Sequence, residues 1–202
     1  MTDFSNTAFA VFHHKTRKPL LPIGVHALLA ITIAVLIAFG LAGCHRQQGP
    51  SAEFQKATVE YVVDGDTIDV VIDGNEKRVR LAGIDAPESA SHEQERNTQE
   101  GVLATEHVRA LLPVGRVVYL QKDVSETDKY GRLVRYVWLD VPSDPNSSEE
   151  ITSKMVNCLI VEAGFARAER FWPDVSYADQ LKEAQKRAAD GGLGVSYLWR
   201  EG

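Results

Sequence analysis

The sequence is poor in cysteine and has no excess of basic residues. Its 202 residues include two cysteines, and 22 lysines and arginines stand against 28 aspartates and glutamates, so the net charge is −6. Two cysteines cannot form the disulfide framework of a small secreted domain, and the fold therefore depends on a hydrophobic core. The acidic balance excludes attraction of nucleic acid to the surface as a whole. A polynucleotide partner would have to be held by a local basic cluster.

Charged residues are missing from one long stretch near the N-terminus. A basic patch at residues 13–18 precedes a run from Pro19 to Cys44 without Lys, Arg, Asp or Glu and rich in Leu, Ile, Ala and Val. A positive segment followed by an apolar one is typical of an export signal. The run also approaches the ~20 residues that span a bilayer, so an uncleaved anchor is the alternative. Both interpretations predict an exported, membrane-anchored protein, periplasmic or at the cell surface.

The apolar run ends in Leu41-Ala42-Gly43-Cys44, which is similar to a bacterial lipobox. In such a motif the cysteine is lipidated and becomes the new N-terminus, so Cys44 is the predicted lipidation site. A lipidated Cys44 leaves Cys158 without an intrachain partner. The apolar neighbours of Cys158 indicate a buried core thiol rather than a catalytic one.

The chain divides into three segments. Residues 1–44 are the predicted export signal or membrane anchor. Residues 45–57 are polar without periodicity, which indicates a flexible linker. Residues 58–200 contain the periodic apolar patterns expected of one folded domain.

Alternating apolar residues predict three strands between Thr58 and Leu81, joined by turns at Asp64-Gly65 and Asp73-Gly74. The first turn would let its carboxylates point outward from a rigid strand end. Further along the chain we expect a helix at 98–112, strands at 117–122 and 133–139, a loop at 140–150, and helices at about 156–163 and 177–189. This order predicts an α+β fold, a five-stranded OB-type Greek-key β-barrel packed by about three α-helices.

Three charged motifs lie in the predicted barrel domain. They are Asp64-Gly65-Asp66-Thr67, Arg80-Leu81-Ala82-Gly83-Ile84-Asp85-Ala86-Pro87-Glu88 and Asp128-Lys129-Tyr130-Gly131-Arg132. Taken singly, each is weak evidence, because Asp-Gly is a common turn and a nearby Arg or Glu is usually a surface charge. Together they supply carboxylates for a hard cation, guanidinium groups for phosphate oxygens, and a glutamate as a base.

In sequence, order and spacing the three motifs resemble those of the staphylococcal-type nuclease (thermonuclease) family. The resemblance covers roughly Thr58 to Trp199. It implies an endonuclease that uses Ca²⁺ to hydrolyse phosphodiester bonds of DNA and RNA, with single strands preferred, and that leaves 3′-phosphates. It also agrees with the OB-type barrel expected from the strand pattern.

The resemblance implies a metal site in the first two motifs. Asp66, Asp85 and the carbonyl of Ala86 are the expected Ca²⁺ ligands, and Asp64 would act through a water molecule. Calcium takes carboxylate, carbonyl and water oxygens in flexible geometry, so these residue types suit it. An ordinary hairpin turn is the alternative for Asp64 and Asp66.

The resemblance also implies three catalytic residues. Arg80 and Arg132 would clamp the phosphate and offset the charge that grows in the transition state. Glu88 would act as the general base, or would orient the attacking water. By contrast, Arg78 is expected to form an exposed salt bridge.

Four residues are expected to contact the substrate. Lys129 and Tyr130 belong to the third motif and would meet a terminal phosphate. Arg170 and Trp172 fall where family members carry tyrosines that contact the nucleotide, and both can stack or pair in their place. This departure affects base preference and leaves the catalytic set unchanged.

Two other functions stay open from the sequence. One is a non-catalytic OB-type module that binds nucleic acid or another ligand, although the presence of Arg80, Glu88 and Arg132 argues against it. The other is a phosphodiesterase that acts on small nucleotides, which the same arginine clamp would serve. We expect a monomer that meets DNA and RNA as substrate and the membrane through its N-terminus.

Overall fold

The computed structural model describes residues 54–89 and 97–199. Cys44, the predicted export or anchor segment and most of the predicted linker lie outside these residues, so those expectations stay predictions. Within the two described stretches, no helix is both long and apolar enough to cross a membrane.

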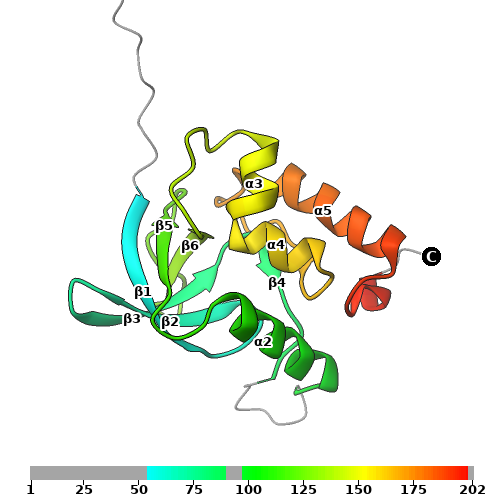
Figure 1. Ribbon diagram of the computed structural model, residues 1–202, viewed down its shortest axis with the longest axis horizontal. Coiled ribbons are helices and arrows are strands. Elements are labelled where there is room, and N and C mark those ends of the chain that lie inside the picture. Colours follow the sequence, from blue (N-terminus) through cyan, green and yellow to red (C-terminus); the bar gives the residue numbers. More distant parts are fainter. Residues whose placement is uncertain (1–53, 90–96, 200–202) are drawn as a thin grey trace, which may run out of the picture. The chain divides into compact units, whose positions relative to one another are not determined.

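Five strands close into a barrel in the order β1-β2-β3-β6-β5 (Figure 1). Neighbours are antiparallel except for β3 and β6, which are parallel. The strands are β1 (Phe54–Val62), β2 (Thr67–Ile72), β3 (Asn75–Leu81), β5 (Val117–Gln121) and β6 (Leu133–Trp138). The predicted α+β fold with a five-stranded OB-type barrel is confirmed. The first strand begins at Phe54, so residues 54–57, expected in the linker, pair with β5 instead.

The hairpin of β2 and β3 shows that the alternating apolar residues of these strands are the ones that face the barrel interior. Ile68 of β2 lies opposite Val79 of β3, and both side chains are fully buried in the barrel. The two-residue turn between the strands has positive φ at Asp73 (50°) and Gly74 (79°). A turn with both central residues at positive φ matches the strand twist and favours Asp-Gly, as the sequence predicted.

In the described residues, four helices and a second, two-stranded sheet accompany the barrel. They are α2 (Gln99–Leu111), α3 (Ser148–Lys154), α4 (Val156–Glu162), α5 (Ala178–Gly191), β4 (Ile84–Asp85) and β7 (Arg167–Ala168), followed by the short 3₁₀ helix η2 (Ser196–Trp199). Strands β4 and β7 pair antiparallel. Helices α4 and α5 lie side by side, as Figure 1 shows.

Helix α3 occupies part of the segment that was expected to be a loop. Its N-cap is Ser147, whose side chain accepts a hydrogen bond from the Glu150 amide. Ile151 is its single buried residue. A seven-residue helix with one buried apolar residue has no apolar periodicity in its sequence. The sequence does carry another signal of a helix start, because Ser147 with Glu150 three positions later forms a capping-box pattern.

The core joins the barrel to α4 and α5. Trp138 of β6 is fully buried and donates through Nε1 to Gln121 Oε1 at 2.8 Å, and the Tyr177 hydroxyl donates to the same oxygen at 3.0 Å. Cys158 of α4 is also fully buried, and burial raises the pKa of its thiol to about 12. The predicted core thiol is confirmed, because the reactive thiolate is strongly disfavoured there.

Candidate active site

Asp66 lies in the turn between β1 and β2, with its carboxylate held inside the protein. Oδ1 accepts a hydrogen bond from Thr67 Oγ1 at 3.0 Å, and Oδ2 accepts one from the Ala86 amide at 3.0 Å. Oδ2 also pairs with Arg80 Nη2 at 3.0 Å. The residue is 7% exposed, so the expectation that this carboxylate points outward is wrong.

Burial dominates the electrostatics of this carboxylate. It raises the pKa of Asp66 to about 7; the Arg80 charge opposes the rise, and the nearby Asp64 charge adds to it. Asp64 accepts the Asp66 amide on its own Oδ1 at 3.1 Å, which fixes the turn. Thus Asp64 supports the backbone that places Asp66, and a cation near Asp66 would favour its ionised form.

Arg80 is placed by the barrel register. It lies on β3, directly opposite Thr67 of β2 and beside Val134 of β6. Its Nη2 contacts Asp66 at 3.0 Å and Asp85 Oδ1 at 3.5 Å. Nη1 donates to its neighbour's carbonyl, Leu81 O, at 2.8 Å. The guanidinium is therefore rigidly held between the two predicted metal ligands.

Asp85 and Ala86 are the two other predicted metal ligands, and both belong to the second motif. Asp85 belongs to β4, and 38% of its side chain is exposed. Besides Arg80, it contacts Arg167 of β7 through Oδ2, at 3.0 Å from Nε and 2.9 Å from Nη2. Ala86 is buried, and its amide binds Asp66. The predicted ligands Asp66 and Asp85 thus meet at one guanidinium, and Ala86 is joined to Asp66 through its amide.

These residues fit a hard cation. In the described part of the chain, no three side chains among His, Cys, Asp and Glu gather as a metal cluster. The predicted set has two carboxylates and one main-chain carbonyl, which are all oxygen donors of the kind that Ca²⁺ prefers. Asp66 and Asp85 already direct oxygens at a common positive group, Arg80 Nη2. Both carboxylates therefore face a point where positive charge is stabilised.

The Glu88 main chain is packed against the start of α2. Its carbonyl accepts a hydrogen bond from the Thr98 amide at 2.9 Å. A Cβ added at Gly101 would lie 2.1 Å from this carbonyl, so only glycine permits the approach. The sequence interpretation did not include Gly101. A glycine inside a helical pattern was the available signal, since it often marks a close backbone contact.

The third motif forms a compact charged turn before β6. Arg132 Nε donates to Asp128 Oδ2 at 2.7 Å, and Asp128 Oδ1 accepts the amides of Tyr130 and Arg132 at 2.9 and 3.0 Å. Burial acts to raise the pKa of Asp128, but Arg132 and these amides bring it below its ordinary value. Arg132 Nη1 also lies 3.4 Å from Thr67 Oγ1. Thr67 therefore links the Asp66 carboxylate to Arg132.

The residues predicted to contact substrate do not all gather at this site. Lys129 Nζ lies 4.9 Å from the centre of the Tyr130 ring, and this tyrosine is 72% exposed beside Arg132. Arg170 instead pairs with Asp179 of α5, while Trp172 is 84% exposed.

Phe171 is the aromatic residue that reaches the arginine site. The Arg80 guanidinium lies 5.6 Å from the centre of its ring. Arg170 and Trp172, which the family resemblance predicts to contact the nucleotide, flank Phe171 in the sequence. The chain turns at this point, where the Phe171 carbonyl accepts the Asp174 amide. The signal for this contact in the sequence was the aromatic side chain of Phe171, which lies between the two predicted positions.

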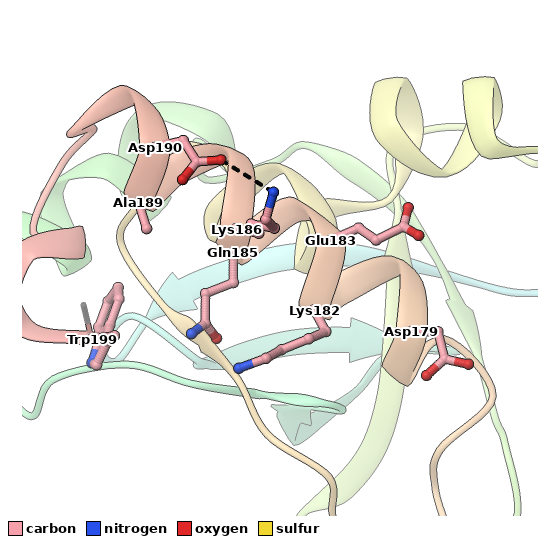
Figure 2. A pocket seen from close by; sticks show the side chains of 8 residues that line it. All are labelled: Asp179, Lys182, Glu183, Gln185, Lys186, Ala189, Asp190 and Trp199. Carbon is pink, nitrogen blue, oxygen red and sulfur yellow. Dashed lines mark ion pairs between the residues drawn. The ribbon is translucent and has the colours of Figure 1, made fainter. Parts of the chain in front are cut away.

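A separate cavity of about 800 Å³ lies beside α5 (Figure 2). Its lining mixes lysines with acidic residues, and Lys186 pairs with Asp190 at 3.5 Å. The lining residues are Asp179, Lys182, Glu183, Gln185, Lys186, Ala189, Asp190 and Trp199. None of them belongs to the three charged motifs.

Comparison with known proteins gives consistent matches. The family described as "Staphylococcal nuclease homologue" matches residues 78–201. The chain is 32% identical to a thermonuclease of Staphylococcus intermedius over 173 residues, which cover 83% of this chain and 93% of that protein. It is 31% identical to a thermonuclease of Staphylococcus hyicus, with 79% and 90% covered. It is also 31% identical to a micrococcal nuclease of Shigella flexneri, with 87% and 86% covered.

Proposed function

The chain belongs to the staphylococcal nuclease family of phosphodiester-hydrolysing enzymes, and we propose that it cleaves DNA and RNA with the aid of Ca²⁺ and leaves 3′-phosphates. The observation that carries this proposal is the approach of two guanidinium groups, one from strand β3 and one from the turn before β6, to the start of β2. Arg80 contacts Asp66 at 3.0 Å, and Arg132 lies 3.4 Å from Thr67, the residue next to it. Two planar cations beside the neighbouring residues Asp66 and Thr67 suit a phosphodiester, whose oxygens gain charge during attack.

Each arginine has a distinct task in this proposal. Arg80 is fixed on β3 and would bind a non-bridging phosphate oxygen. Arg132 is supported by Asp128 and would stabilise the departing 5′ oxygen. Glu88 would accept a proton from the attacking water or orient it, and its main chain is held by α2 through Thr98.

The proposed metal ligands are Asp66, Asp85 and the Ala86 carbonyl, with Asp64 acting through water. A bound Ca²⁺ would polarise a phosphate oxygen and lower the barrier to attack. The protein's own contribution is to hold the two carboxylates in place, Asp66 by Thr67 and Ala86, and Asp85 by β4.

Exposed aromatic rings support a preference for single strands. Phe171 lies over Arg80, and Tyr130 lies beside Arg132, with 44% and 72% of these residues exposed. Such rings can stack on bases only where the bases are unpaired. The net charge of −6 gives no general attraction to polynucleotides, so we expect modest affinity and low processivity.

We also propose that the enzyme is exported and tethered to a membrane. The support is the basic patch and apolar run of residues 1–44, with Cys44 as the lipidation site or the run itself as an uncleaved anchor. The oligomeric state that we propose is a monomer.

The test is a digestion assay with the full-length chain solubilised in detergent. Single-stranded DNA, duplex DNA and RNA are each incubated with calcium, with magnesium, and with a chelator. We expect cleavage that requires calcium, fastest on single strands, with 3′-phosphate ends. Binding without cleavage under every condition would indicate the non-catalytic module. Cleavage of dinucleotides alone would indicate a small-molecule phosphodiesterase.

A further inference from the structure

Asp85 has a second cationic neighbour besides Arg80. Strands β4 and β7 pair antiparallel, and the register sets Asp85 directly opposite Arg167. Facing residues of an antiparallel pair hold their side chains close together on one side of the sheet. Arg167 accordingly contacts Asp85 Oδ2 twice, at 3.0 Å from Nε and 2.9 Å from Nη2. The strand register therefore places the two side chains within reach of each other.

Arg167 does not depend on Asp85 alone for a partner. Its Nη2 also lies 3.6 Å from Glu169 Oε2. If Asp85 turns towards a metal ion, Glu169 remains as an acceptor for the guanidinium. The Arg167 guanidinium can therefore leave Asp85 and still have a carboxylate partner, Glu169.

We propose that Arg167 is a built-in cation that competes with the metal for Asp85 and so weakens calcium binding. This inference rests on the metal site of the proposed function. A guanidinium on Oδ2 occupies one of the two carboxylate oxygens and offsets the negative charge of Asp85, and its own positive charge would repel a dication bound to Asp85. Since 46% of the Arg167 side chain is exposed, solvent screens the repulsion, and we expect an effect of about three- to tenfold on affinity.

The test measures calcium binding to the full-length protein by isothermal titration calorimetry. Arg167→Gln removes the charge, and Arg167→Met does so while keeping the aliphatic packing. Arg167→Lys keeps the charge. The matched control is Arg187→Gln, since Arg187 has the same 46% side-chain exposure and an ion pair with Glu162 at 2.7 Å. This control removes one positive charge from a pair outside the charged motifs.

We expect the Kd for calcium to fall about three- to tenfold in Arg167→Gln and Arg167→Met and to stay near the wild-type value in Arg167→Lys and Arg187→Gln. Circular dichroism of the calcium-free proteins checks that each variant is folded. An unchanged or weaker affinity in both charge-removing variants, with a normal wild type, would overturn the inference and make Arg167 a support for Asp85. A wild-type protein that binds no calcium would refute the proposed metal site and the competition together.

Discussion

At the scale of the residue, Arg132 is held by two contacts while its proposed role is to bind phosphate. Its Nε is committed to Asp128, and its Nη1 is directed at Thr67. Lysine would keep the positive charge but lacks the planar fork, so Arg132→Lys loses the bidentate phosphate contact. We expect kcat on single-stranded DNA to fall about 10²–10³-fold in steady-state assays, with a smaller change in KM.

Arg78 offers the matched control for this change. It pairs with Asp69 at 2.8 Å on the exposed surface, as the sequence predicted. Arg78→Lys should keep the wild-type kcat. Equal kinetics of the two variants would remove Arg132 from the catalytic site.

The substitution Glu88→Gln tests the proposed role of Glu88 as general base. The change keeps size and hydrogen-bonding capacity but deletes the charge and the proton acceptor. If Glu88 activates water, kcat should drop about 10²–10⁴-fold while calcium affinity measured by calorimetry stays constant. A loss confined to calcium affinity would identify Glu88 as a ligand, and unchanged values of both would leave it outside the chemistry.

At the scale of elements, α2 is the support for the Glu88 segment. Alanine at Gly101 would place a Cβ 2.1 Å from the Glu88 carbonyl, and that contact can be relieved only by moving the main chain. In an open helix Gly→Ala stabilises by about 1 kcal/mol, so a destabilised Gly101→Ala protein would reveal the clash. We expect a lower melting temperature and a lower kcat. A variant as active and stable as the wild type would show that α2 does not position Glu88.

The packing of α2 also predicts a pH effect on stability. His107 stacks on Phe165 with ring centres 4.4 Å apart, and burial lowers the pKa of His107 below its ordinary 6.5. The unfolded chain therefore binds the proton more readily, so this contribution is complete above about pH 6.5 and is lost as the pH falls. We expect the free energy of unfolding in urea to drop less between about pH 7.5 and 5 in His107→Phe than in the wild type. An equal drop would assign the pH effect to other groups.

At the scale of the whole molecule, the proposed membrane attachment of this acidic enzyme can be tested. The prediction concerns Cys44, whose thiol is the atom that lipid would modify. Cys44→Ser should abolish lipidation and release the protein from the membrane fraction with nuclease activity intact. Membrane fractionation and intact-mass measurement check this. A variant that stays membrane-bound at its full precursor mass would favour the uncleaved anchor.

The sequence by itself determined the family, the barrel and the three motifs. Asp64 and Asp66 lie in one turn with Thr67 directly after it, and Asp128 and Arg132 share another turn, so contacts within each motif follow from local chain geometry. The strands were predictable for a related reason. A barrel strand buries one face, and that burial imposes the alternation seen at Ile68 and Val70 of β2. Short α3 has a single buried residue and left no such pattern.

Only the tertiary structure decided what faces the motifs. The ion pair between Asp85 and Arg167 joins residues 82 positions apart, and it depends on the register of β4 and β7. The contact of Arg80 with the Phe171 ring likewise joins β3 to the segment before α5. The burial of Asp66 likewise depends on Arg80 and Ala86 closing over it. Contacts of this kind depend on how segments far apart in the sequence pack together, and the spacing of residues along the chain does not predict that packing.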